Sequence, residues 1–210
     1  MEEALARKAG PASRKEQQAV VARERIVHAV VECLDQHGYA ETSINRIQER
    51  AGISRGALTH HFPSKEELMV VTAERLLKPT LVPLRKGPRP MATPEERKAT
   101  IEADIVWMWE RLVDTREGRA LLEILVASRT DLALKGRISE TFSRWNHTIS
   151  DSLVVNYLGL GVAEDELREI WTMCRVFLRG LNTQNQFEAD EQARRALVRS
   201  FARMIAARLA

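Results

Sequence analysis

The chain has little of what marks secreted, membrane-spanning or metal-binding proteins. Among its 210 residues only Cys33 and Cys174 are cysteines, and their spacing fits neither a metal site nor a redox motif. No run of 18 apolar residues occurs, and the N-terminus lacks the apolar core of a secretory signal. We therefore expect a cytoplasmic protein with reduced thiols, no membrane partner, no metal and no cofactor.

Glycine (10 residues) and proline (7 residues) are also scarce, while apolar residues recur with a period near 3.6. The sequence therefore predicts an all-α fold of about nine helices. The net charge is only +3, and residues 1–65 hold ten basic and eight acidic side chains. Because a protein that coats nucleic acid without specificity is far more basic, DNA binding would have to rest on a local motif.

Enzymatic motifs are missing as well. The chain has no phosphate-binding loop, no HExxH helix, no nucleophile elbow and no cysteine–histidine pair at a meaningful spacing. We therefore predict no catalytic residues and do not expect an enzyme.

The most informative stretch is residues 41–68, ETSINRIQERAGISRGALTHHFPSKEEL. Two short helical patterns, at about residues 44–51 and 55–61, flank a tight turn. Gly52 suits the left-handed end of the first helix because it lacks a Cβ, and Ser54 can cap the second. The second helix has one apolar anchor and otherwise presents donors and small residues, which suits the DNA major groove. The spacing predicts a helix-turn-helix.

Helices on either side should support this motif. A helix over about residues 15–37 carries an apolar stripe that begins with Val20. Ser64 and Glu67 form the pattern of a capping box that opens the helix after the motif. Further helices are predicted at about residues 94–114, 117–128, 131–158, 163–187 and 190–209, after a proline-rich linker at about 78–93.

The same region resembles the DNA-binding region of the TetR (tetracycline-repressor-like) transcriptional regulators. The resemblance is ungapped and covers RERIVHA at 23–29, GY at 38–39, TSI at 42–44, AGISRG at 51–56, HF at 61–62 and KEEL at 65–68. Two positions depart from the family's pattern: Gln48 replaces the usual alanine, and Thr59 replaces a tyrosine that contacts phosphate. Threonine keeps a hydroxyl donor but shortens its reach.

The resemblance implies a three-helix DNA-binding domain at residues 1–66, with 1–14 as a mobile arm, and a C-terminal helical bundle for effector binding and dimerisation at 67–210. Arg55 is the implied base reader, because arginine can grip guanine with two hydrogen bonds. Other positions would contact phosphates and set the register. The implied DNA contacts are Thr42, Ser43, Asn45, Arg55, Gly56, Ala57, Thr59, His60 and Lys65.

A homodimer on a palindromic operator is also expected, since one motif reads only a few base pairs. By resemblance, the last two helices pair with those of a second copy. The candidate interface residues are Phe177, Gly180, Leu181, Leu197, Phe201 and Met204. Alternatively, these residues only complete the core of one chain.

Aromatic and methionine side chains gather in three helices of the bundle. They indicate a pocket for a small apolar or aromatic effector, although some of them could simply fill the core. The candidates are Trp107, Met108, Phe142, Trp145, His147, Trp171 and Met173. Arg119, Arg144 and Arg175 are further candidates to pair with an anionic group, or else surface residues.

The function predicted is that of a sequence-specific transcriptional regulator that represses by binding double-stranded operator DNA and releases it when an effector binds. One alternative is a DNA-binding regulator without an effector, whose bundle only dimerises or binds a protein partner. A helical enzyme or binding module is a weaker alternative.

Overall fold

The structure, a computed structural model, describes residues 14–81, 93–157, 161–185, 187 and 190–209. The predicted mobile arm, apart from Arg14, lies outside the described residues, as do residues 82–92 of the predicted linker. All regular structure in the described part is helical, which confirms the all-α prediction. Its α-helices are α1 (Arg14–Glu41), α2 (Ile44–Ala51), α3 (Arg55–His61), α4 (Lys65–Leu77), α5 (Pro94–Met108), α6 (Arg116–Ala127), α7 (Leu132–Tyr157), α8 (Glu164–Gln184) and α9 (Glu191–Leu209).

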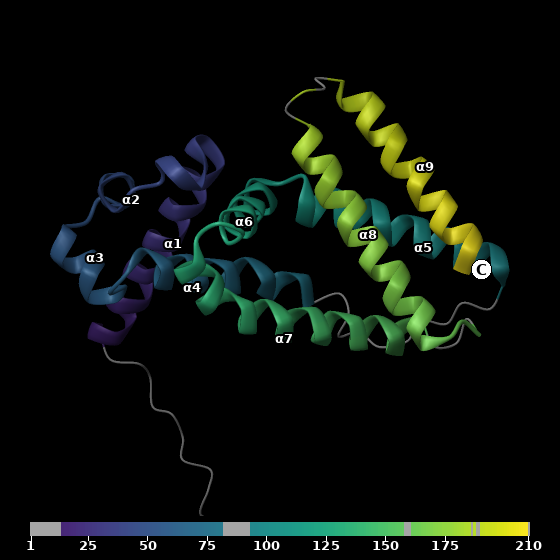
Figure 1. Ribbon diagram of the computed structural model, residues 1–210, viewed down its shortest axis with the longest axis horizontal. Helices are drawn as coiled ribbons and strands as arrows, with labels where there is room; N and C mark the ends of the chain where they lie inside the picture. The colour runs from purple at the N-terminus through teal and green to yellow at the C-terminus, as the bar shows by residue number, and fades with distance from the viewer. Residues whose placement is uncertain (1–13, 82–92, 158–160, 186, 188–189, 210) are drawn as a thin grey trace, which may run out of the picture.

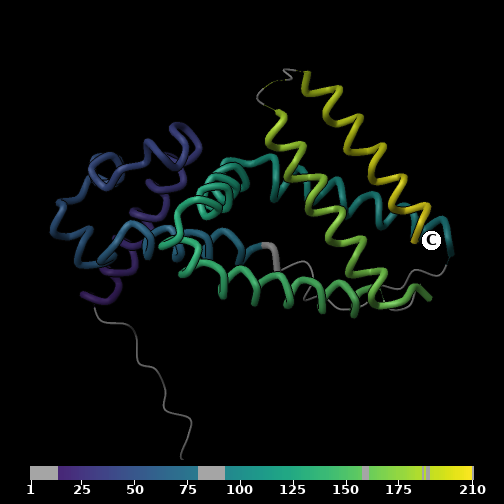
Figure 2. The backbone as a smooth tube through the Cα atoms, viewed as in Figure 1, coloured from purple at the N-terminus to yellow at the C-terminus, as the bar shows by residue number. Residues whose placement is uncertain are grey.

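Helices α1–α3 form one end of the molecule, and α5, α8 and α9 form the other (Figure 1). The long helix α7 runs from the first group to the second, and α6 lies between the two groups (Figure 2). No described helix combines the length and the hydrophobicity that crossing a bilayer requires.

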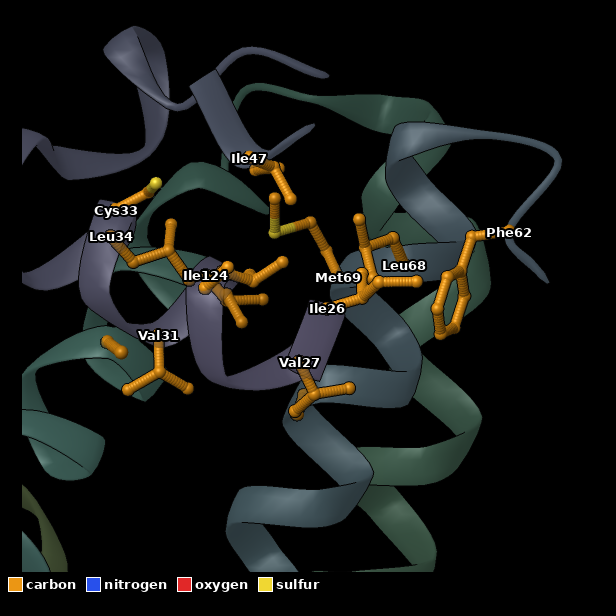
Figure 3. Close-up of a cluster of buried hydrophobic side chains, with 14 of the residues drawn as sticks. Ile26, Val27, Val31, Cys33, Leu34, Ile47, Phe62, Leu68, Met69 and Ile124 are labelled. Carbon is orange, nitrogen blue, oxygen red and sulfur yellow. The ribbon is translucent and has the colours of Figure 1, made fainter. Parts of the chain in front are cut away.

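The core of the N-terminal end extends beyond the predicted DNA-binding domain. Ile26 of α1, Ile47 of α2 and Leu68 of α4 are fully buried together with Ile124 of α6 (Figure 3). Leu134 of α7 belongs to the same cluster. The predicted DNA-binding helices therefore share a core with α6 and α7, and the domain boundary near residue 66 stays a prediction.

A second core holds the other end together. Ile101 and Ile105 of α5 pack with Phe201 and Ile205 of α9, and Cys174 of α8 joins this cluster. Burial raises the pKa of the Cys174 thiol to about 12. The thiol is therefore neutral and part of the core.

Some local details add to or differ from the predictions. The helix expected over 94–114 is α-helical to Met108 and then continues as a π-helical turn, η3 (Trp109–Val113). Gly38 adopts the non-helical angles φ 71° and ψ 174°, so the regular part of α1 stops there, close to the end predicted at about residue 37, and a short helical segment follows the kink. Val20 is 59% exposed and does not belong to the apolar stripe of α1.

Candidate DNA-binding surface and ligand cavity

The caps predicted at Gly52 and Ser54 are present, together with a cap at Ser43 that was not predicted. Ser43 caps α2 by accepting a hydrogen bond from the Arg46 N–H at 3.2 Å, and Ser54 caps α3 by accepting from the Ala57 N–H at 3.2 Å. Gly52 ends α2 with φ 62° and ψ 42°, in the left-handed region. These local signals fix the direction in which α3 leaves the turn.

Helix α3 packs against the rest of the chain with one side, and its other side is exposed. Leu58 and the residue that ends the helix, Phe62, are each 1% exposed. Arg55, Thr59 and His60 lie on the solvent side. No described residue forms an ion pair or hydrogen bond with the Arg55 guanidinium, so its donors are available to a partner outside the chain.

The predicted DNA contacts fall into an exposed set and a covered set. Ser43, Asn45, Arg55, Gly56, Thr59 and His60 are exposed, while Ala57 and Lys65 are half-buried. Thr42 is completely buried, and its hydroxyl donates to the Gly38 carbonyl oxygen at 2.6 Å. The prediction of a phosphate contact from the Thr42 side chain was therefore wrong, because its hydroxyl is used inside the fold.

Two of the predicted phosphate contacts already have partners within the chain. Lys65 Nζ donates to the Tyr39 carbonyl oxygen at 3.1 Å and lies 4.1 Å from the centre of the Tyr39 ring. Its pKa is lowered, chiefly by desolvation, and an ammonium group still has further protons to offer. The Thr59 hydroxyl donates to the Arg55 carbonyl oxygen at 3.0 Å and would have to rotate to reach a phosphate.

Tyr39 connects the DNA-binding helices to α6 and α7, a role that sequence reasoning missed. Its N–H donates to Glu123 Oε2 at 2.9 Å, and its hydroxyl donates to Asp131 Oδ2 at 2.8 Å. Asp131 also accepts a hydrogen bond from the Leu134 N–H at 2.9 Å. Both bonds lower the pKa of the Asp131 carboxyl, and the bond from Leu134 has the larger effect. The only signal in the sequence was an aromatic residue directly after Gly38.

Ion pairs join α1 to α6 on their exposed sides. Arg119 Nε lies 2.6 Å from Asp35 Oδ1, and Arg116 Nη1 lies 3.3 Å from Glu32 Oε1. Arg119 was a candidate for binding an anionic ligand, but its guanidinium is used in this contact. Together with Tyr39, these pairs connect the position of α6 to that of α1.

A cavity of about 140 Å³ lies among the helices of the bundle. Four of the predicted pocket residues line it, and three do not. Those that line it are Trp107, Met108, Trp145 and Trp171. Other apolar lining residues are Leu77 of α4, Leu112 of η3, Leu121 and Leu122 of α6, Ile149 and Leu153 of α7, and Leu178 of α8.

The remaining three predicted pocket residues have other surroundings. His147 is exposed, and its Nδ1 lies 2.8 Å from the Ser143 carbonyl oxygen. Met173 packs against the core that α5 and α9 form. Phe142 packs beside the lining residue Trp145, with ring centres 5.2 Å apart, but does not itself line the cavity. His147 and Met173 each lie two positions from a lining tryptophan, and residues at that spacing point to different sides of a helix.

Two arginines supply the cationic groups of the cavity. Arg175 Nη1 donates to Asn146 Oδ1 at 2.6 Å, and the Arg175 Nε is buried without an acceptor in the described structure. The Arg179 guanidinium lies 5.2 Å from the Phe142 ring centre and 5.9 Å from that of Trp145. Burial and the nearby charge of Arg175 lower the pKa of Arg179 to about 10. Sequence reasoning did not place Arg179 in this cavity.

Some of the predicted dimer residues are buried within the chain, and others are exposed on its surface. Phe177 stacks on Phe201 with ring centres 3.9 Å apart, and both Phe201 and Leu181 are buried within the chain. Gly180 of α8 and Leu197 and Met204 of α9 are exposed, the latter two by 46% and 61%. Phe201 and Leu181 thus belong to the core of the chain itself.

Comparisons with known proteins agree with this arrangement. Residues 26–71 match the family described as bacterial regulatory proteins, tetR family. The HTH-type transcriptional regulator CymR of Pseudomonas putida is 26% identical over 182 residues, which cover 84% of this chain and 85% of CymR.

Solved structures share the fold along most of the chain. A transcriptional regulator (RHA1_ro04179) from Rhodococcus sp. Rha1 superposes with a TM-score of 0.71 at 19% identity, covering 89% of this chain and 95% of that one. The transcriptional regulator FadR from Bacillus subtilis, solved in complex with stearoyl-CoA, gives a TM-score of 0.61 at 16% identity, covering 87% and 97%. At these identities the likeness concerns the fold alone.

Proposed function

Because the chain belongs to the TetR family of DNA-binding transcriptional regulators, we propose that it is a homodimeric, ligand-responsive repressor. In this proposal it binds a palindromic operator and releases it when a small, largely apolar or aromatic molecule occupies the cavity. Its relatives are regulators and not enzymes.

The exposed side of α3 carries the DNA-binding part of the proposal. Arg55 projects from the first turn with unused donors, and Gly56 has no atom within 4 Å of the position that a Cβ would take. A bare backbone beside a free guanidinium suits close approach to base edges in the major groove. Ser43, Asn45, His60 and, after rotation of its hydroxyl, Thr59 would hold the backbone phosphates around it.

The cavity supports an effector. Its lining is apolar and aromatic with a few polar groups, as small-molecule sites usually are. FadR, which shares the fold, has been solved with stearoyl-CoA bound, so this architecture can hold a ligand with an apolar part.

The proposed route from the cavity to the DNA runs through α6. Leu121 and Leu122 line the cavity, while Glu123 accepts the hydrogen bond from Tyr39 and Arg119 pairs with Asp35 of α1. An effector that favours another position of α6 would therefore move α1 and, with it, α2, which packs on α1 and leads into the recognition helix α3. Successive half-sites on DNA lie roughly 34–36 Å apart, so a small change in the separation of two recognition helices weakens binding.

The second copy is proposed to pack on α8 and α9. Gly180 lies on the same exposed side of α8 as Val176, one turn earlier, which is 64% exposed. Leu197 and Met204, two turns apart, give α9 an exposed apolar stripe as well. Such stripes are typical of a helical interface, and a bare glycine admits a neighbouring backbone.

The direct test is fluorescence anisotropy with DNA from upstream of the protein's own gene, against a scrambled duplex of equal length. The proposal expects at least a hundred-fold preference for the upstream DNA, a dimer in light scattering, and loss of the preference in Arg55→Ala. Equal affinity for both duplexes would overturn it. Specific binding that no small molecule releases would favour the alternative regulator without an effector.

A further inference from the structure

Two cationic side chains without an anionic partner among the described residues line a largely apolar cavity. Arg175 and Arg179 stand one turn apart on α8, and both belong to the cavity lining. Within the described residues, no carboxylate oxygen lies within 4.0 Å of either guanidinium. The surrounding lining is formed by side chains such as Trp107, Trp145 and Leu153.

This arrangement is costly for the chain alone. A buried charge is normally paired, and a buried donor normally has an acceptor. The Nε of Arg175 is buried and has no acceptor among the described residues. The same is true of the indole Nε1 of Trp171, which also lines the cavity. The Arg179 guanidinium faces two aromatic rings and feels the charge of Arg175, and no described residue accepts a hydrogen bond from it. The groups that lack partners are donors, so the missing partner is an acceptor.

The charge of the lining residues and the volume of the cavity limit further which ligands could bind there. Asp104 lines the same cavity and accepts a hydrogen bond from the Tyr157 hydroxyl, so the ionisable lining residues carry two positive charges and one negative charge. One anionic group would balance them. A volume of about 140 Å³ is close to that of an engineered cavity of about 150 Å³ that binds benzene.

We propose that the ligand of this cavity is a monocarboxylate whose apolar body is about the size of one six-membered ring, and that Arg175 and Arg179 bind its carboxylate. The proposal rests on the proposed function in assuming that the cavity holds an effector. A planar carboxylate matches the planar guanidinium with two parallel hydrogen bonds, which gives orientation as well as affinity. The aromatic side chains would then enclose the apolar body.

The test compares acids with amides of the same shape. Benzoate, 4-methylbenzoate, phenylacetate, cyclohexanecarboxylate and hexanoate are each titrated into the full-length protein by calorimetry, beside benzamide and the other corresponding amides. We expect at least one acid to bind ten-fold or more tightly than its amide, which corresponds to about 1.4 kcal/mol. Arg175→Gln and Arg179→Gln should each remove that preference. Arg144→Gln is the matched control, because Arg144 is 68% exposed and pairs with Glu140 on the outside of α7.

Each outcome decides the question. Binding of none of the five acids, amides that bind as tightly as acids, or a preference that survives both substitutions at the cavity would overturn the proposal. The comparison of acid with amide in the unmodified protein needs no variant, so poor folding of Arg179→Gln would not obscure it.

The same samples separate this proposal from the repressor proposal. DNA release by a neutral apolar compound but by no acid would leave the repressor and exclude the carboxylate ligand. Acid binding without any effect on DNA affinity would leave the carboxylate site and exclude the effector role.

Discussion

Gly56 offers a test in which stability and DNA binding should change in opposite directions. It lies in the first turn of α3, is exposed, and has no atom within 4 Å of a built Cβ. Replacing a helical glycine by alanine reduces the entropy of the unfolded chain. Gly56→Ala should therefore raise the free energy of unfolding by about 0.5–1 kcal/mol.

On DNA the same methyl group should be unfavourable. If α3 enters the major groove with its first turn leading, the methyl stands between the Gly56 backbone and the base edges. Breaking one close contact of this kind typically costs about 1–3 kcal/mol. We therefore expect Gly56→Ala to bind operator DNA about ten-fold more weakly, although the protein itself is more stable.

The control is Gly136→Ala in α7. Gly136 is also helical and exposed, and no atom lies within 4 Å of the position that its Cβ would take. Alanine there should therefore add similar stability without weakening DNA binding. Urea unfolding and fluorescence anisotropy on the same samples measure both quantities. A stabilised Gly56→Ala protein with full operator affinity would refute the placement of this side of α3 against DNA.

The remaining predictions concern other contacts of the described structure. Arg55→Ala should lose about 1–3 kcal/mol of binding to operator DNA and much less to random DNA, and equal losses in a gel shift would contradict base reading. Ser54→Ala removes the cap of α3 and should lower the free energy of unfolding by about 1 kcal/mol in urea, so an unchanged midpoint would count against the cap. Tyr39→Phe removes a hydrogen bond that lowers the pKa of Asp131 in the folded protein. A carboxyl with a lowered pKa stabilises the fold at pH values above its pKa in the unfolded chain, and this stabilisation is lost as the pH falls. The difference in the free energy of unfolding between Tyr39→Phe and the unmodified protein should thus be larger at pH 7 than at pH values below the usual pKa range of an aspartate. A difference that does not change with pH would exclude this linkage. Because burial raises the pKa of Cys174 to about 12, its thiol should react with a disulfide reagent at pH 8 only after unfolding, in contrast to immediate labelling of an accessible thiol.

The starts of helices could be predicted because they depend on a few adjacent residues. Ser54 and Ser64 each accept a hydrogen bond from the backbone N–H three positions on, as their spacing predicted, and Thr93 does the same at the start of α5. At Thr93 the Glu96 side chain also accepts from the Thr93 N–H at 3.1 Å, which completes a capping box. Gly52 takes the left-handed conformation for the same local reason.

The surroundings of polar side chains could not be predicted in this way, because they depend on residues distant in the sequence. Nothing near Thr42 indicates that its hydroxyl donates into a kink at Gly38. Lys65 meets the Tyr39 carbonyl from 26 positions away. The neighbours of Arg179 in the sequence do not show that its guanidinium packs against two aromatic rings of α7.

Helix α6 explains why a binding event in the cavity need not stay local. Consecutive residues on a helix point about 100° apart, so Leu121 and Leu122 can line the cavity while Glu123 holds Tyr39 on another side. The start of the helix is also tightly packed, since a Cβ on Gly118 would come within 2.2 Å of the Val113 carbonyl oxygen in η3. If a ligand binds the cavity as proposed, a helix held in this way would move as a unit, and a displacement that suited the ligand would be passed to α1. Linkage makes this reciprocal: if a ligand weakens operator binding by some factor, operator DNA must weaken ligand binding by that same factor.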